Sequence, residues 1–313
     1  MLSTATTTAT ATSMTAEPVA QALRDEATRV LAPLADLAAP VAPGAEPPWD
    51  QLVRVAEHQV RKAADCLASA AYDGDFDGWR AAYARKRVGR AVLERMRRGA
   101  SLSPGELATA VVSEMGHDGR DGLGQWLGSL GPGGTAAVVR DATTFAVAAR
   151  AAFATWPPAT GTRFGVPFAW DLPTRAVRLE AMADAITGPT RDLLVLATST
   201  VDGAAEQRDL AWLALVATLG TGQLPNRITR IDLASGHRRT VAATDDVLDA
   251  GLTGAARAVE AAMAARYTAP APPTRGAWCR ACAGQPVCPA GHARQPSGGS
   301  GPGGPTGPFP HGA

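Results

Sequence analysis

Three of the four cysteines in this chain stand close together near its C-terminus. Cys279, Cys282 and Cys288 have the spacing C-x2-C-x5-C, whereas Cys66 lies more than 200 residues upstream. Four thiolates can hold a tetrahedral zinc ion or an iron–sulfur cluster. Buried apolar cysteines and a C-x-x-C redox pair are the alternatives, but a redox pair opens a helix, and this one lies in a loop rich in Gly and Pro. The spacing therefore indicates a four-cysteine metal site.

Basic residues concentrate in two stretches of the sequence, within residues 83–98 and 226–239. The first stretch contains Arg85, Lys86, Arg87 and Arg90. Guanidinium groups bind phosphate through paired hydrogen bonds, and several of them together make nucleic-acid binding depend on salt. Arginine is also the ordinary surface cation of this chain, whose only lysines are Lys62 and Lys86, so a solvated charged face is the alternative. We expect the first stretch to contact DNA.

The overall composition is that of a globular protein with no dominant charge. Of the 313 residues, 46% are hydrophobic, which suffices for a sizeable core, and the formal net charge is +1. No apolar run reaches the roughly 18 residues that a membrane-spanning helix needs. The N-terminus also lacks the basic and apolar segments of a secretory signal. We therefore expect a cytoplasmic protein with no membrane partner.

The two ends of the chain differ in composition from its middle. Residues 1–48 are rich in Thr, Ala and Pro and are predicted to be mostly disordered, with a short helix over 19–37. Residues 292–313 are rich in Gly and Pro and are predicted to be a disordered tail. One folded domain is therefore expected over residues 49–291.

Apolar residues at helical spacing predict four helices in the first part of this domain, residues 49–157. The predicted helices cover residues 49–72, 76–99, 101–115 and 135–155. Gly99 is expected to end the second helix. Ser103 and Glu106 are expected to form a capping box at the start of the third.

The second part, residues 158–291, consists of short apolar runs separated by turn residues. We expect an antiparallel meander of three strands, followed by a helix that Gly220 ends, a strand and a last helix. Their predicted ranges are 163–172, 176–186, 192–200, 204–220, 226–236 and 245–267. This order predicts an α/β (α+β) fold with a mixed sheet flanked by helices and a helical region on its N-terminal side.

The position of the cysteines resembles that in a known group of proteins. One cysteine on an N-terminal helix and three after the last helix resemble the iron–sulfur staple of RecB-like nucleases of the PD-(D/E)XK superfamily, a pattern shared by AddB-type, exonuclease V-type and CRISPR-adaptation nucleases. The family's WCxxCxxxxxCP is matched by Trp278, Cys279, Cys282, Cys288 and Pro289. Over residues 49–291 the resemblance implies a restriction-endonuclease-like core. It also implies a [4Fe–4S] cluster held by these three cysteines and Cys66, with zinc as the alternative.

The resemblance also identifies where the nuclease chemistry should lie, and the sequence departs from the family there. The family's Asp near the end of the second meander strand is matched by Asp184, four residues before Gly188. The D-x-K signature of the third strand is replaced by Ala197-Thr198-Ser199, and no lysine follows Lys86. A lone carboxylate is a poor Mg²⁺ site, because that ion requires near-octahedral oxygen coordination. We therefore expect a remnant Asp184 and no further catalytic residue.

These patterns together predict a nuclease-like iron–sulfur protein that is catalytically inactive and binds DNA or a DNA-processing partner, such as a helicase-type protein. One alternative is an active metal-dependent DNA exonuclease or endonuclease, for which alone Mg²⁺ is expected. Its displaced ligands would come from Asp192, Asp202 or Glu206, and Arg191 or Arg208 would replace the charge of the lysine. The other alternative is a zinc-stabilised interaction protein.

Overall fold

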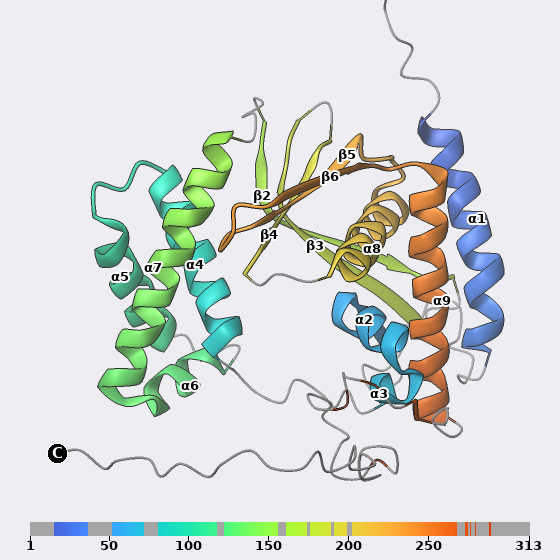
Figure 1. Cartoon of the computed structure of the whole chain (residues 1–313), viewed down its shortest axis with the longest axis horizontal. Coiled ribbons are helices and arrows are strands. Elements are labelled where there is room, and N and C mark those ends of the chain that lie inside the picture. The colour runs from blue at the N-terminus through green and yellow to red at the C-terminus, as the bar shows by residue number, and fades with distance from the viewer. Residues whose placement is uncertain are drawn as a thin grey trace, which may run out of the picture.

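The computed structural model describes most of the predicted domain and one segment before it. The described residues are 16–36, 52–71, 81–117, 122–155, 161–173, 176–188, 191–198 and 202–267, together with 273, 274, 276, 279 and 288. A sheet lies between two groups of helices in this structure (Figure 1). No helix within the described ranges is long and apolar enough to cross a membrane.

The sheet is mixed, as the order of elements predicts. Its strands are β1 (Val53–Ala56), β2 (Arg163–Asp171), β3 (Val177–Ile186), β4 (Leu193–Ala197), β5 (Arg227–Asp232) and β6 (Arg238–Ala242). Strands β2, β3 and β4 form the antiparallel meander that the sequence predicts. Strand β5 runs parallel to β4, and β6, which the sequence does not predict, pairs antiparallel with β5. Strand β1 pairs parallel with β3.

Strand β1 corrects the prediction of a single helix over residues 49–72. In Val53–Ala56 two buried valines alternate with the exposed Arg54, and this alternation is the side-chain pattern of a strand. Pairing with β3 satisfies the backbone groups that a helix would have paired internally. The helix begins only after Ala56, whose N–H donates a 2.6 Å hydrogen bond to the side-chain carbonyl of Gln59.

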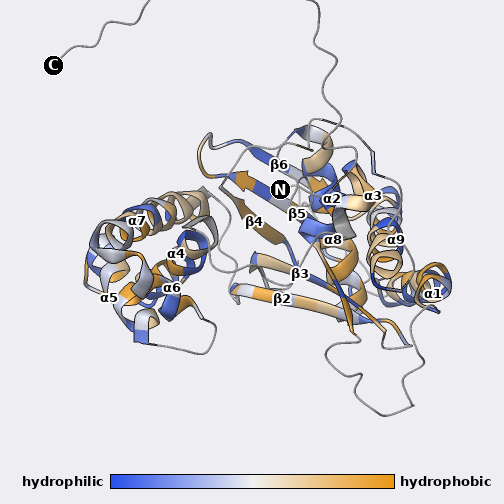
Figure 2. Ribbon diagram, turned by 90° about the horizontal axis from the view of Figure 1, so that it is seen from below, coloured by the Kyte–Doolittle hydropathy of each residue, from blue (hydrophilic) through white to orange (hydrophobic). Residues whose placement is uncertain are grey.

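Five helices pack together on one side of the molecule (Figures 1 and 2). They are α1 (Ala16–Ala35), α2 (Glu57–Asp65), α3 (Leu67–Ala71), α8 (Gly203–Thr221) and α9 (Asp245–Tyr267). Helix α8 contacts β2, β3 and β5 as well as α2 and α9, so it is buried over most of its length. It ends at Gly222, which has a positive φ of 70°, rather than at the predicted Gly220.

Helix α1 belongs to the core, although it lies in the segment 1–48. Its apolar face, which includes Leu23 and Leu31, is buried, and the helix contacts α8 and α9. The guanidinium of Arg24 donates hydrogen bonds of 2.9 and 2.8 Å to the carbonyl oxygen of Leu219, one of the carbonyls that the end of α8 leaves unpaired. The helix predicted over residues 19–37 is thus present as α1, although it packs into the core outside the range expected for the domain.

The other group of helices forms a bundle with a core of its own. It consists of α4 (Ala81–Arg97), α5 (Pro104–His117), α6 (Leu123–Ser129) and α7 (Gly131–Thr155). The predicted capping box is confirmed, because Ser103 N–H donates to Glu106 at 2.8 Å and Glu106 N–H donates to the Ser103 hydroxyl at 3.3 Å. Leu93 of α4 and Phe145 of α7 pack against Leu194 of β4, which attaches the bundle to the sheet.

Close packing between helices α8 and α9 depends on one glycine. A Cβ atom at Gly251 of α9 would lie 2.5 Å from the carbonyl oxygen of Ala211 and 3.0 Å from the Cβ of Leu215, both in α8. The first of these distances is shorter than real contacts allow, and the backbone oxygen cannot rotate away as a side chain could. The two helices can therefore approach this closely only while residue 251 lacks a side chain.

We expect Gly251→Ala to lower the free energy of unfolding by about 1–3 kcal/mol, because the added methyl group forces the helices apart. The matched control is Gly133→Ala in helix α7, where nothing lies within 4 Å of the added atom. The control should leave stability unchanged or raise it by up to about 1 kcal/mol, since alanine favours helix over glycine. Urea denaturation followed by circular dichroism measures both. Equal effects of the two substitutions would contradict the close contact.

Candidate functional site

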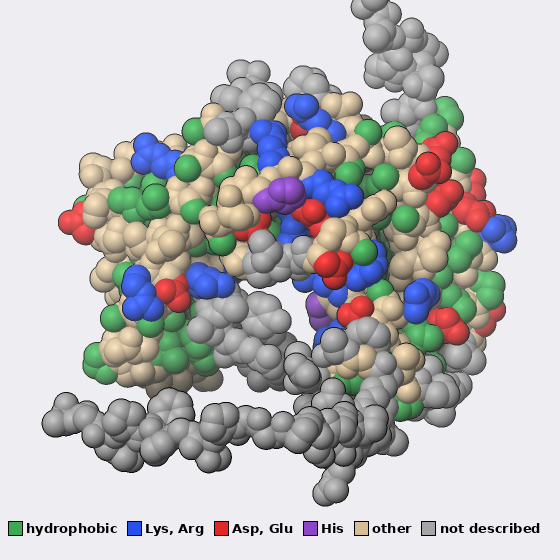
Figure 3. All heavy atoms as spheres, viewed as in Figure 1, with side chains coloured by type: hydrophobic (Ala, Val, Ile, Leu, Met, Phe, Trp, Pro, Cys, Tyr) green, Lys and Arg blue, Asp and Glu red, His purple; other side chains and the backbone are tan. Residues whose placement is uncertain are grey.

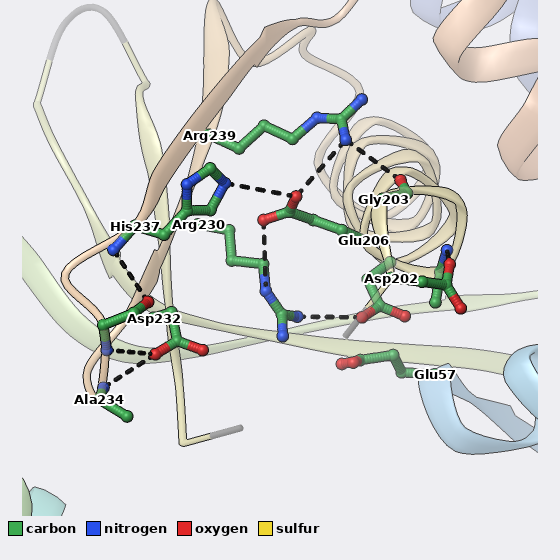
Figure 4. A network of polar contacts seen from close by, with 12 residues as sticks. Glu57, Asp202, Gly203, Glu206, Arg230, Asp232, Ala234, His237 and Arg239 are labelled. Atoms are coloured by element: carbon green, nitrogen blue, oxygen red, sulfur yellow. Dashed lines mark hydrogen bonds and ion pairs between the residues drawn. The ribbon is translucent and has the colours of Figure 1, made fainter. Parts of the chain in front are cut away.

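Charged side chains from several elements converge beside the sheet, between the bundle and helix α8. The carboxylates come from α2, α8 and strand β3, and the guanidinium groups from α2, α4, β5 and β6. Figure 4 shows the part of this network that surrounds Glu206 and Arg230. We call the set Glu57, Arg61, Lys86, Arg90, Asp184, Glu206, Asp209, Arg230 and Arg239 the central network.

Asp184 lies near the end of β3, where the sequence places it, and its carboxylate is buried and fully paired. One oxygen accepts hydrogen bonds from Arg90 of helix α4, with Nε at 2.6 Å and Nη2 at 2.5 Å. The other oxygen accepts a 2.7 Å hydrogen bond from the backbone N–H of Leu196 in β4. Arg90 thus supplies the positive charge that compensates this buried carboxylate.

Helix α8 contributes two further buried carboxylates, Glu206 and Asp209, and both are paired with arginines. Arg230 of β5 is itself buried and lies 3.0 Å from Asp209 and 3.6 Å from Glu206. Arg61 of α2 donates two 2.6 Å hydrogen bonds to Asp209. Arg239 of β6 reaches Glu206 at 3.4 Å. These pairs join α2, α8, β5 and β6 through charge-assisted hydrogen bonds.

A small cavity lies beside three members of the central network. The cavity bounded by Glu57, Asp209 and Arg230 has a volume of about 10 Å³. A single water molecule needs about 10–15 Å³. A Mg²⁺ ion with its octahedral shell and a substrate phosphate require far more room than this. Between Glu57, Asp209 and Arg230 there is thus room for about one water molecule and not for a hydrated cation.

Two members of the central network lie in an environment that alters their ionisation. Lys86 of α4 is half-buried, and burial lowers the pKa of its ammonium group despite the attraction of Asp184. Burial also raises the pKa of Glu57, against the attraction of Arg61. The attraction of Asp184 and of Glu57 acts to raise the pKa of Lys86, so its ammonium group lies within electrostatic range of both carboxylates.

The four residues expected to contact DNA do not form one exposed surface. Arg90 binds Asp184, and Lys86 is half-buried in the central network. Arg85 has a buried Nε atom without a hydrogen-bond partner among the described residues, and only Arg87 is largely exposed. In the second basic stretch, Arg227 pairs with Asp192 at 2.8 Å. Several of the predicted phosphate-binding cations are thus engaged with carboxylates of the same chain.

The residues considered as displaced metal ligands have structural partners. Asp192 precedes β4 and accepts hydrogen bonds from Asn226 at 2.9 Å and from Arg227 at 2.8 Å. Asp202 caps helix α8 by accepting a 2.7 Å hydrogen bond from the N–H of Ala205. Glu206 belongs to the central network described above. None of the three carboxylates is left unpaired.

Two arginines are considered as replacements for the D-x-K lysine. Arg191 is bound to other side chains, and Arg208 lines a different cavity. Arg191 binds Thr221 Oγ1 at 2.9 Å and the side chain of Gln223. Ala197 is buried at the end of β4, and Thr198 follows it in a bend. Ser199 is outside the described residues. Arg208 lines a different cavity, which helices α2, α8 and α9 enclose.

Cys66 and Cys279 both lie against the backbone of Thr274. The N–H of Thr274 donates a 3.3 Å hydrogen bond to Cys66 Sγ, while the Thr274 carbonyl oxygen lies 4.0 Å from Cys279 Sγ. The N–H of Gly276 donates to Cys279 Sγ at 3.4 Å. Cys288 is buried. Cys282 lies outside the described residues.

The environment of these sulfurs fits thiolate ligands. Backbone N–H groups that point at sulfur stabilise negative charge on it and are common around metal-bound cysteines. Both sulfurs that have described hydrogen bonds receive such donors, from Thr274 and Gly276. A four-thiolate set suits either a [4Fe–4S] cluster or zinc. If bound there, the group would join the end of helix α2 to the segment after α9.

Comparison with known proteins gives little guidance. No protein-family model and no curated protein matches the chain. Among solved structures, one titled "Crystal structure of SSO0001" is similar over 87% of this chain and 96% of that chain, with 11% sequence identity and a TM-score of 0.35. This similarity is too low to carry an argument about fold or function.

We expect Arg90→Met to lower the free energy of unfolding by about 3–5 kcal/mol, because it leaves the buried charge of Asp184 unpaired. The double variant Arg90→Met/Asp184→Asn should be more stable than Arg90→Met alone, since the amide carries no charge and can still accept from Leu196. The control Arg95→Met breaks the exposed pair between Arg95 and Glu114 and should cost at most about 1 kcal/mol. Urea denaturation measures all three. A double variant no more stable than Arg90→Met would contradict this role for the ion pair.

Proposed function

We propose that this protein is a nuclease-like protein that lacks phosphodiesterase activity, carries a metal group on its four cysteines, and binds DNA or a DNA-processing protein. The observation that carries the proposal is the ion pair between Arg90 and Asp184. The carboxylate that would hold a catalytic cation holds a guanidinium group of the same chain instead.

The order of elements supports a nuclease-like core. An antiparallel meander, β2–β3–β4, is followed by helix α8 and by a strand, β5, that is parallel to the last strand of the meander. This is the arrangement that the cysteine pattern implies through its resemblance to RecB-like nucleases. Asp184 lies on the middle strand of the meander, at the position that the resemblance assigns to it.

The proposal of DNA or protein binding rests on the charge of one face. Basic side chains and a histidine gather with acidic ones at the centre of the face in Figure 3. His237 and Arg238 at the start of β6 are exposed, as is Arg87 on α4. Exposed arginines can bind phosphate or a carboxylate of a partner. The cytoplasmic location expected from the sequence belongs to this proposal.

A second candidate function, an active nuclease with displaced groups, is favoured by one observation. Lys86 of helix α4 interacts with Asp184 and Glu57, although it is far in sequence from the strand that usually carries the lysine. A lysine there could orient a water molecule or neutralise charge on a phosphate. This function would require Arg90 to leave Asp184 when a metal ion binds.

Anaerobically purified protein is expected to be brown and to contain iron and sulfide, because four thiolates hold a [4Fe–4S] cluster. Cys66→Ser should lower the iron content and the melting temperature. The control Ser69→Ala removes the hydroxyl that bonds to the Cys66 carbonyl oxygen, keeps every thiol, and should retain iron. Iron, zinc and sulfide analysis with visible absorption spectra measures the outcome. Colourless protein containing one zinc per chain would instead support the zinc-stabilised interaction protein.

Labelled single- and double-stranded DNA should remain uncut in the presence of Mg²⁺ or Mn²⁺. In the same gels, retarded DNA that is released by salt would identify DNA as the partner, whereas unretarded DNA would favour a protein partner. The variants Asp184→Asn and Lys86→Met separate the two candidate functions. Metal-dependent cutting that either variant abolishes would overturn the inactive reading and support the active nuclease.

A further inference from the structure

A second cavity lies between helices α2, α8 and α9, and its walls are formed by one face of each helix. The volume is about 120 Å³. The lining residues recur every three or four positions along their helices, so their side chains point the same way. They are Val60 and Ala64 of α2, Arg208 and Trp212 of α8, and Ala250, Gly251, Thr253, Gly254 and Arg257 of α9.

Two glycines of α9 shape this cavity. The contact of Gly251 with α8 brings those two helices together, as described above. A Cβ atom at Gly254 would lie 3.1 Å from Cγ1 of Val60, so α2 also approaches α9 closely. Because both positions lack side chains, the floor of the cavity is backbone and small apolar groups rather than a packed core. Thr253 and Arg257 are exposed, so the cavity opens to solvent along α9.

The charged residues that line the cavity are all basic. Two arginines, Arg208 and Arg257, line it, and no acidic residue does. The Nε atom of Arg208 is buried and has no hydrogen-bond partner among the described residues. Elsewhere in the same helix, Glu206 and Asp209 each bind an arginine from another element. A buried donor without an acceptor costs free energy, and an unpaired N–H of this kind is commonly satisfied by an ion or water.

We propose that this cavity is a binding site for a small oxyanion, a phosphate or carboxylate carried on a short apolar body. The cavity is many times larger than the roughly 10–15 Å³ that one water needs. The oxyanion would accept hydrogen bonds from Arg208 and Arg257, which form charge-assisted bonds to either group. The apolar part would contact Val60, Ala64 and Trp212. The site uses none of the central network and is independent of the proposed function.

The test is titration calorimetry of the full chain with sodium phosphate and, separately, with sodium propionate, at constant ionic strength set by sodium chloride. Saturable binding of either anion is expected at one site per chain. Arg257→Gln should raise the Kd about tenfold or more, because it removes a charged hydrogen bond. Arg257 is exposed, so this variant should fold, and circular dichroism checks that it does. Arg257→Lys should recover part of the affinity.

The control variant is Arg150→Gln, which removes an exposed arginine of helix α7 that does not line the cavity, and its Kd should equal that of the unaltered protein. Binding of phosphate alone would identify a phosphorylated ligand, and binding of propionate alone a carboxylic acid. The proposal is overturned if neither anion binds saturably. It is equally overturned if Arg257→Gln and Arg150→Gln weaken binding to the same extent, since the effect would then reflect net charge.

Discussion

Burying several carboxylates at the centre of the molecule costs free energy, and the arginines that pair with them offset this cost. Asp184, Glu206 and Asp209 are all buried. An isolated buried charge costs so much free energy that the fold cannot leave any of them alone. The partners come from elements that are distant in sequence, such as Arg90 from α4 and Arg230 from β5. The carboxylates therefore determine how the bundle, the sheet and α8 fit together.

The same pairing explains why the site is poorly suited to metal chemistry. A metal-dependent phosphodiesterase leaves the compensating charge at its carboxylates to a bound cation. Here the guanidinium groups are covalently part of the chain and lie at hydrogen-bonding distance from the oxygens. A divalent ion would have to displace them, and the cavity beside Asp209 has a volume of only about 10 Å³. The ion pairs that stabilise the network are thus the same contacts that a cation would have to break in order to bind.

The sequence predicts those parts of the fold that local patterns determine. The meander, the capping box at Ser103 and the last helix follow from alternation, capping residues and helical spacing. Strand β1 cannot be predicted from such local patterns. Its four residues adjoin a helix, and they form a strand only because they pair with β3, which lies more than 100 residues further along the chain. Helix α1 is predicted within residues 1–48, but its packing on α8 and α9 does not follow from the local sequence pattern.

For the candidate site, residue types and spacing indicate Asp184 and the cysteines but not their partners. Arg90 is predicted as a DNA contact from its place in a basic run, and only the packing of α4 on the sheet reveals its binding to Asp184. Glu57, Asp209 and Arg230 are missed because no motif links positions this far apart. A basic residue inside a largely buried strand, Arg230, is the one signal that could have indicated the network.

The hydrogen bond between Thr274 and Cys66 joins residues 208 positions apart and has a consequence for the order of assembly. Closing so long a loop costs chain entropy, so such a contact forms after shorter-range structure has brought its ends together. Helices α2 and α3 pack on α9, and this packing delivers the segment after α9 to Cys66. Cys66 and Cys279 would then meet only in a chain that has already folded, so the metal group that we propose for the cysteines would be inserted after folding.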